Sequence, residues 1–226
     1  VLHGAAETLE DGESIQAMAG WASTHGITLV GGSITERREG RDKLSNTSIV
    51  FDPEGELAAV YRKIHMFDVD VGGVEYRESD TEAAGDEVVA APLGTAKLGM
   101  TVCYDLRFPE LFRALLDLGA DIFAVPSAFT AVTGRDHWKV LLRARAIENQ
   151  GFVVAANQFG TAEPHFDSWG HSMIVDPWGR VLADAGDAEG YAIADLDFAE
   201  RDRILGSLPA IHNRRPDVFR DGKGAA

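Results

Sequence analysis

Between residues 96 and 157 the sequence alternates short apolar runs with longer amphipathic ones. Short β-branched runs are typical of buried strands, and apolar residues spaced three or four apart are typical of helices. The pattern predicts strands over 96–103, 121–126 and 152–157, and helices over 108–118 and 136–150. Pro109 in a first turn, Gly119 after a last turn and a capping Asp136 support these helix boundaries. Strands that alternate with helices predict a mixed α/β sheet protein.

Hairpins are predicted on both sides of this region, each at a turn signal rich in Pro and Gly. The predicted strand pairs are 46–51 with 56–63, 87–91 with 96–103, and 171–176 with 180–185. The other predicted elements are a helix over 14–25, strands over 27–33 and 191–196, a short helix over 198–208, and loops over 68–86 and 127–135. Because no linker of Pro, Gly or Ser interrupts the chain, we expect a single domain over residues 1–226.

The composition excludes several classes of function. The formal net charge is −15, whereas a protein that binds nucleic acid or an anionic membrane needs a basic surface, so we expect neither partner. No apolar run approaches the roughly 18 residues of a membrane-spanning helix. Cys103 is the one cysteine, so no intramolecular disulfide is possible, which is consistent with a cytoplasmic location. The histidines lack HxH or HExxH spacing, and we expect no metal.

Cys103 ends the apolar run LGMTVC, directly before a predicted helix. A strand-to-helix turn can lift a thiol out of the sheet and leave the following backbone N–H groups free to bind an oxyanion. Those N–H groups also favour the thiolate. A lone cysteine beside an apolar strand is more commonly a buried small hydrophobe. Here the polar residues Tyr104, Asp105 and Arg107 crowd the end of the strand and favour a nucleophile.

The run CYDLRFPEL, from Cys103 to Leu111, resembles the nucleophile segment of the nitrilase superfamily of carbon–nitrogen hydrolases. Other motifs match in order: YRKIHMFD (61–68), Ser127 to Phe129 with Thr133 and His137-Trp138, RARAIE (143–148), GHSMIVDPWG (170–179) and RRPD (214–217). Tyr-Asp after the cysteine is similar to the branch of omega-amidases and deaminated glutathione amidases. The resemblance covers nearly the whole chain and implies a hydrolase that cleaves the C–N bond of a small amide without a cofactor.

The resemblance also implies partners for Cys103. The catalytic lysine of the family lies in the motif that contains Lys63, where it would stabilise the oxyanion of the tetrahedral intermediate. A second glutamate of the family corresponds to Glu78 and helps to hold the lysine and the general base. Four further residues match positions that line the substrate pocket: Tyr104, Arg107, Phe129 and Thr133.

Arg107 has two open interpretations from the sequence. It can pair with a carboxylate of the substrate, which suits the bidentate geometry of a guanidinium. It can instead pair with Glu110, three residues further along the helix start. His137 is interpreted as a structural hydrogen-bonding residue rather than a proton carrier.

The resemblance implies a four-layer α-β-β-α sandwich that forms a homodimer through helices near the nucleophile. It also implies that the C-terminal tail, with Arg214 and Arg215, packs on the partner subunit.

One part of the family's machinery has no match in the sequence. The resembled enzymes take the general base from a glutamate in a Pro-Glu element, which follows an early strand ahead of the lysine. Here Glu7, Glu10 and Glu13 follow no predicted strand, and the chain starts with Val. We therefore expect that the sequence lacks roughly the first two strands and one helix of the fold.

Three alternatives remain open from the sequence. A papain-like hydrolase would activate Cys103 with a His–Asn pair, for which His171 and Asn157 are available. An inactive homologue would serve as an interaction module if the general base is absent. Within the enzyme interpretation, a true nitrilase is the alternative to an amidase, and the acyl group of the substrate is not fixed.

Overall fold

The computed structural model describes residues 2–162 and 166–220. Within these ranges the two main sheets have three and six strands. The antiparallel three-stranded sheet has the order β1 (Leu29–Glu36), β2 (Ser45–Phe51) and β3 (Leu57–Arg62). The six-stranded sheet has the order β13 (Val181–Asp184), β12 (Met173–Val175), β9 (Phe152–Ala155), β8 (Ile122–Ala124), β7 (Ala96–Met100) and β6 (Ala90–Leu93). Its strands β7, β8 and β9 are parallel, and the flanking pairs are antiparallel.

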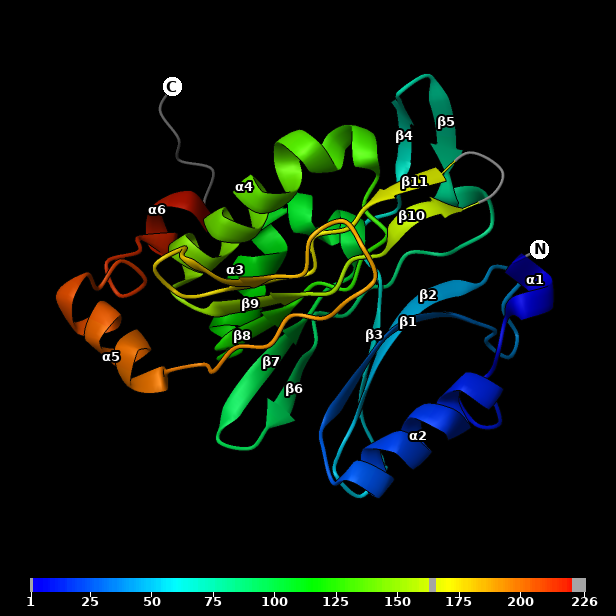
Figure 1. Ribbon diagram of the computed structural model, residues 1–226, viewed down its shortest axis with the longest axis horizontal. Coiled ribbons are helices and arrows are strands. Elements are labelled where there is room, and N and C mark those ends of the chain that lie inside the picture. Colours follow the sequence, from blue (N-terminus) through cyan, green and yellow to red (C-terminus); the bar gives the residue numbers. More distant parts are fainter. Residues whose placement is uncertain (1, 163–165, 221–226) are drawn as a thin grey trace.

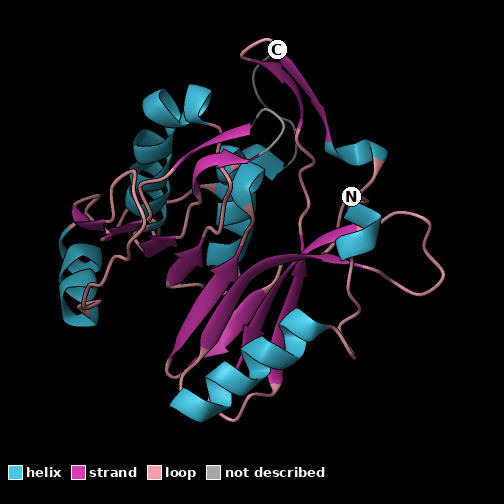
Figure 2. Cartoon of the chain, turned by 45° about the vertical axis from the view of Figure 1, so that its right-hand side comes forward, coloured by secondary structure: helices cyan, strands magenta, loops and turns pink. Residues whose placement is uncertain are grey.

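Helices cover the outer faces of both sheets (Figures 1 and 2). The helix α2 (Glu13–His25) lies on the three-stranded sheet, and α3 (Pro109–Asp117) and α4 (Ala131–Asn149) lie on the six-stranded sheet. The two sheets contact each other through β3 and β6. This order of layers confirms the predicted four-layer α-β-β-α sandwich. The short helices α1 (Leu2–Ala5), α5 (Phe198–Ser207) and α6 (Pro216–Arg220) lie at the periphery.

The strand β2 shows how the sequence builds these layers. Successive side chains of a strand point to opposite faces of the sheet. Accordingly, Ile49 and Phe51 pack in the cluster under α2, whereas Val50 belongs to the larger core around the six-stranded sheet. All three side chains are buried, so β2 is covered on both faces.

Two hairpins lie outside the main sheets, and the first of them corrects the loop predicted over 68–86. Residues 68–86 contain β4 (Asp68–Val71), β5 (Val74–Arg77) and the 3-10 turn η1 (Glu78–Asp80). Gly72 and Gly73 join β4 to β5 with positive φ angles of 61° and 78°, which an antiparallel two-residue turn of this kind requires. The second hairpin pairs β10 (Phe159–Ala162) with β11 (Phe166–Trp169). Both hairpins lie beside the first turns of α4 (Figure 1).

Three other predicted boundaries are wrong. The helix α4 begins at Ala131 rather than at Asp136. Its first turns include Gly134, which packs closely against Trp169. The strand β7 ends at Met100, and a 3-10 turn, η2 (Cys103–Arg107), carries the cysteine. Residues 191–196 form no strand, because in the described chain no neighbouring strand pairs with them. None of the helices in the described ranges is long and apolar enough to cross a membrane.

Candidate active site

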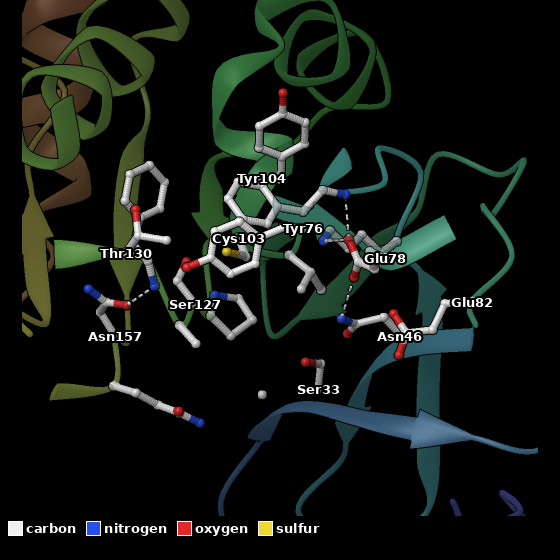
Figure 3. Close-up of a pocket in the computed structure, with 18 of the residues that line it drawn as sticks. Ser33, Asn46, Tyr76, Glu78, Glu82, Cys103, Tyr104, Ser127, Thr130 and Asn157 are labelled. Carbon is white, nitrogen blue, oxygen red and sulfur yellow. Dashed lines mark hydrogen bonds and ion pairs between the residues drawn. The ribbon is translucent and has the colours of Figure 1, made fainter. Parts of the chain in front are cut away.

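One pocket, with a volume of about 1070 Å³, gathers the residues that the sequence predicted for the site. They come from four separate segments of the chain: Lys63 after β3, Glu78 in η1, Cys103, Tyr104 and Arg107 in η2, and Phe129 and Thr133 around the start of α4. All seven line the pocket, and Figure 3 shows Cys103 at its centre. The fold therefore brings the predicted set together, although its members are spread from position 63 to position 133.

Cys103 occupies a strained backbone conformation. Its φ angle is 50°, in the left-handed region that non-glycine residues seldom adopt. The turn is held because the Cys103 N–H donates to the Pro126 carbonyl, at 2.9 Å from the nitrogen to the oxygen. This turn breaks the line of β7 and leaves the thiol half-buried at the pocket wall. The arrangement agrees with the predicted strand-to-helix turn, with a 3-10 turn in place of a helix start.

Asp105 links the cysteine turn to the strand end that carries the lysine. Its carboxylate is fully buried and accepts hydrogen bonds from the Val102 N–H (2.8 Å) and the Tyr61 hydroxyl (2.7 Å). The ring of His65 lies 2.7 Å from the other carboxylate oxygen, with Nδ1 facing it. Burial and the neighbouring Asp105 charge raise the pKa of Tyr61, which stays a hydrogen-bond donor. Tyr61 and His65 flank Lys63 in sequence, so this network fixes the nucleophile relative to the lysine.

Lys63 and Glu78 form an ion pair in which the lysine is buried and the glutamate half-buried. Lys63 is 3% exposed, and its Nζ lies 2.5 Å from Glu78 Oε2. Glu78 also accepts from the Phe67 N–H at 2.6 Å and from the Asn46 side-chain amide at 3.2 Å (Figure 3). Burial opposes the ionisation of Glu78, but the charge of Lys63 and these hydrogen bonds lower the pKa of its carboxyl below the ordinary value. The pair therefore presents an oriented cation at the pocket wall.

A second glutamate, Glu82, is buried beside this pair. Its carboxyl is hydrogen-bonded to that of Glu78. Burial raises the pKa of Glu82 to about 7, the hydrogen bond and charge of Glu78 act in the same direction, and Lys63 opposes them. The sequence did not indicate this residue, because it lies on a predicted loop, four positions after Glu78, and no motif marks it.

The cysteine thiol is not activated by its surroundings alone. Burial raises the pKa of the Cys103 thiol above its ordinary value, and the negative charges of Glu78 and Asp105 add to this effect. The charge of Lys63 and a hydrogen bond from the Ala128 backbone lower it in part. Since the thiolate is the nucleophile, the thiol needs a base to take its proton.

Arg107 lies among aromatic rings on another wall of the pocket. Its guanidinium carbon is 4.9 Å from the centre of the Phe129 ring and 5.8 Å from that of Tyr104. Its Nη1 lies 3.2 Å from Nδ1 of His137, which accounts for the predicted structural role of that histidine. No ion pair joins Arg107 to Glu110 in the described chain. The guanidinium therefore faces the pocket without a carboxylate partner.

Thr133 lies in the first turn of α4, and its hydroxyl is 2.8 Å from that of Thr130. Both residues line the pocket beside Phe129. The backbone N–H of Phe129 donates to the Asn157 side chain at 2.8 Å, so a neighbouring strand end fixes this wall.

The residues of the papain-like alternative have other partners. His171 lies 2.9 Å from Asp184, and its ring stacks on Trp169. Asn157 uses its side chain to bond the Phe129 N–H and the Gly170 carbonyl. Among the described residues that line the pocket there is no histidine. A His–Asn activation of Cys103 is therefore wrong for this geometry.

Glu7 accepts hydrogen bonds from the backbone and hydroxyl of Ser14 at the start of α2, outside the pocket. Within residues 2–162 and 166–220, no cluster of three or more His, Cys, Asp or Glu side chains could hold a metal ion.

Comparisons with known proteins identify the family of the chain. The carbon–nitrogen hydrolase family model matches residues 2–204. A deaminated glutathione amidase of Yersinia enterocolitica is 44% identical over 213 residues, which cover 92% of this chain and 74% of that protein. The human omega-amidase NIT2 is 39% identical over 209 residues, which cover 92% of this chain and 75% of that enzyme.

Among solved structures, the crystal structure of Saccharomyces cerevisiae Nit3, a member of branch 10 of the nitrilase superfamily, superimposes with a TM-score of 0.84. Its sequence is 34% identical, and the match covers 93% of this chain and 74% of that one. The family model and these relatives extend over most of the chain. The chain therefore belongs to the carbon–nitrogen hydrolase family.

Proposed function

We propose that this protein hydrolyses the C–N bond of a small omega-amide, of the deaminated glutathione or alpha-ketoglutaramate type, with Cys103 as its nucleophile. The observation that carries the proposal is the convergence of Cys103, the Lys63–Glu78 pair and the unpaired Arg107 on one pocket. The names of the relatives, deaminated glutathione amidase and omega-amidase, support the same class of reaction.

The proposed reaction has two halves. A base takes the proton of the Cys103 thiol, sulfur attacks the amide carbon, and the carbonyl becomes an oxyanion. Lys63 Nζ and the backbone N–H near Tyr104 stabilise this charge, which exists only in the tetrahedral state. The C–N bond then breaks as the base returns the proton to nitrogen, which leaves as ammonia or an amine. Water, deprotonated by the same base, attacks the thioester and releases the acid and the thiol.

The general base of this scheme is proposed from the family resemblance. That resemblance assigns the role to a glutamate in a Pro-Glu element ahead of the lysine, with Glu78 helping to hold both. The raised pKa of the Cys103 thiol supports the need for such a base.

The substrate class is argued from the charge of the pocket. Arg107 has no carboxylate partner in the described chain, and burial lowers the pKa of its guanidinium without discharging it. A half-buried cation of this kind favours a substrate that brings its own carboxylate. Omega-amides of dicarboxylic acids carry such a carboxylate at the end opposite to the amide. The aromatic rings of Tyr104 and Phe129 would pack along the chain between them.

Release of ammonia from alpha-ketoglutaramate or a simpler omega-amide, and release of the dipeptide amine from deaminated glutathione, test the proposal. Wild-type protein is expected to release the ammonia or amine of at least one substrate, and Cys103→Ala to release neither while keeping the wild-type thermal unfolding midpoint. Ammonia release from a nitrile but from no amide would identify a true nitrilase. No release from any of these compounds by the natural full-length chain would overturn the proposal and favour an inactive interaction module.

We also propose that the protein is a single-domain, cytoplasmic homodimer. The exposed outer face of α4 supports the dimer, since Val140 is 65% exposed and Ile147 is 46% exposed on the same side of the helix. Arg214 of the tail bonds Asp117 of its own α3, next to this face. The one free thiol supports a reducing compartment.

A further inference from the structure

We propose that Glu82 is a positioning residue for the amidase reaction: its protonated carboxyl donates a hydrogen bond to Glu78 and keeps that carboxylate aimed at Lys63. This inference rests on the proposed function of Lys63 and Glu78. Glu82 itself touches neither the thiol nor a place assigned to the substrate amide, so its effect on catalysis is indirect.

The backbone fixes Glu82 beside the ion pair. Its N–H donates to the Glu78 carbonyl at 3.0 Å, one helical turn away, so both side chains leave the backbone on the same side. Leu44 bonds both neighbours of Glu82, because its N–H donates to Thr81 (3.0 Å) and its carbonyl accepts from Ala83 (2.8 Å). This segment is therefore tied to the strand end that precedes β2.

A second tie joins the same segment to Lys63. The Gly85 N–H donates to the Lys63 carbonyl at 2.8 Å. A Cβ atom at Gly85 would lie 2.2 Å from the Arg62 carbonyl oxygen, so the close approach depends on glycine. The side chain of Glu82 is consequently held 6% exposed against Glu78, and Figure 3 shows the two carboxyl groups on the same side of the pocket.

Counting charges shows why a proton must stay in this cluster. Lys63 carries one positive charge, whereas Glu78 and Glu82 would carry two negative ones if both were ionised. Carboxylates in hydrogen-bond contact cannot both ionise without strong repulsion, so one proton is shared between them. In the described chain the charges that act on Glu82 are those of Glu78 and Lys63. Lys63 lies closest to Glu78, which keeps its charge, and the proton therefore resides on Glu82.

The arrangement predicts a dependence on pH. Burial raises the pKa of Glu82 to about 7, so the protonated form that donates to Glu78 is present below this value. As the pH rises through it, Glu82 ionises, its hydrogen bond to Glu78 is lost, and a second negative charge faces Lys63. The lysine is then drawn toward two carboxylates and away from the oxyanion. We expect kcat to fall on the alkaline side for this reason.

Two variants separate positioning from a merely structural role. Glu82→Gln keeps a donor to Glu78 but cannot ionise, whereas Glu82→Leu keeps the bulk and loses the donor. We expect Glu82→Leu to lower kcat about tenfold to 100-fold with little change in KM. Glu82→Gln is expected to retain most of the activity and to lose the alkaline decline between about pH 6 and about pH 9. Glu54→Gln, an equal change of charge in the exposed β2–β3 turn, is the control and should keep the wild-type profile.

The results that would overturn the role of Glu82 differ from those that would overturn the proposed amidase function. Equal activity of wild type and Glu82→Leu, or an alkaline decline that survives in Glu82→Gln, overturns the proposal. Loss of activity in Glu82→Gln as large as in Glu82→Leu also overturns it, since a general base would behave in that way. If the wild type hydrolyses no amide, pH-difference infrared spectra still test whether Glu82 is protonated below about pH 7. A carboxylic-acid band titrating near pH 7 and absent from Glu82→Gln supports the proposal, and its absence from the wild type contradicts it.

Discussion

At the scale of single residues, three cationic side chains that line the pocket differ in their partners. Lys63 is paired with Glu78, and Arg77 bonds Asp70 and Glu75, whereas Arg107 has no carboxylate partner in the described residues. We predict that Arg107→Gln lowers kcat/KM for alpha-ketoglutaramate roughly tenfold to 150-fold. That range corresponds to a lost charge-assisted hydrogen bond of about 1.5–3 kcal/mol. Steady-state ammonia release measures it.

Two controls test whether the charge of Arg107 recognises the substrate. A neutral omega-amide of the same chain length should lose much less than alpha-ketoglutaramate in Arg107→Gln. Arg135→Gln, an equal change of charge on the exposed side of the neighbouring helix, should leave both substrates unchanged. An equal loss for both substrates in Arg107→Gln would show that the arginine supports the fold of the pocket instead.

Residues of the site differ in how far the sequence reveals them. Cys103, Lys63 and Glu78 lie in motifs that the family resemblance identifies, so their meeting in one pocket could be predicted. Asp105 was visible only as a polar neighbour of the cysteine, because its partners Tyr61 and His65 lie 44 and 40 positions away. Glu82 gave no signal at all, since its significance depends on burial and on the distance to Glu78.

At the scale of elements, the helix α4 begins earlier than its sequence suggests because packing overrides propensity. Gly134 lies in its first turns, and a Cβ atom there would stand 2.3 Å from Cβ of Trp169 on β11. We predict that Gly134→Ala lowers the free energy of unfolding by about 1–3 kcal/mol. This cost exceeds the gain of up to about 1 kcal/mol that alanine brings to a helix. Urea-induced unfolding measures the net change.

A matched glycine in another helix provides the control. Gly20 lies within α2, and a Cβ atom there would meet nothing within 4 Å. Gly20→Ala should therefore raise the free energy of unfolding by about 0.5–1 kcal/mol. If Gly134→Ala stabilises the protein as well, the contact with Trp169 does not restrict the helix.

The central strands and helices were predictable because each combines a hydrophobic period with a boundary residue such as Pro109 or Gly119. The hairpins β4–β5 and β10–β11 were not, since each of their strands has only four residues and lies in a segment that resembles a loop. The expected strand over 191–196 has alternating apolar residues, but Tyr191 and Ile193 are 83% and 77% exposed. A strand needs a hydrogen-bonding neighbour as well as a pattern.

At the scale of the whole molecule, the formal net charge is −15, whereas the outer face of α4 exposes large apolar side chains. Val140 and Ile147 lie seven residues apart on this face, and the turn that carries the 49% exposed Trp178 packs beside them through a 2.6 Å bond from Arg143 to Gly179. Apolar side chains that cluster on one face mark an interaction surface more often than scattered ones do. A second copy would cover the patch about a two-fold axis, which makes the same residues face each other.

We predict that Val140→Glu converts the proposed homodimer into a monomer, because the interface would have to bury a carboxylate in place of an apolar side chain on each copy. Light scattering coupled to size exclusion measures the mass in solution, and the wild type should keep its dimer mass at high salt. Trp21→Glu places the same charge on the exposed face of α2, in the opposite outer layer, and should leave the mass unchanged. A wild-type protein that is monomeric at all concentrations, or a Val140→Glu variant that remains a dimer, would exclude this face as the interface.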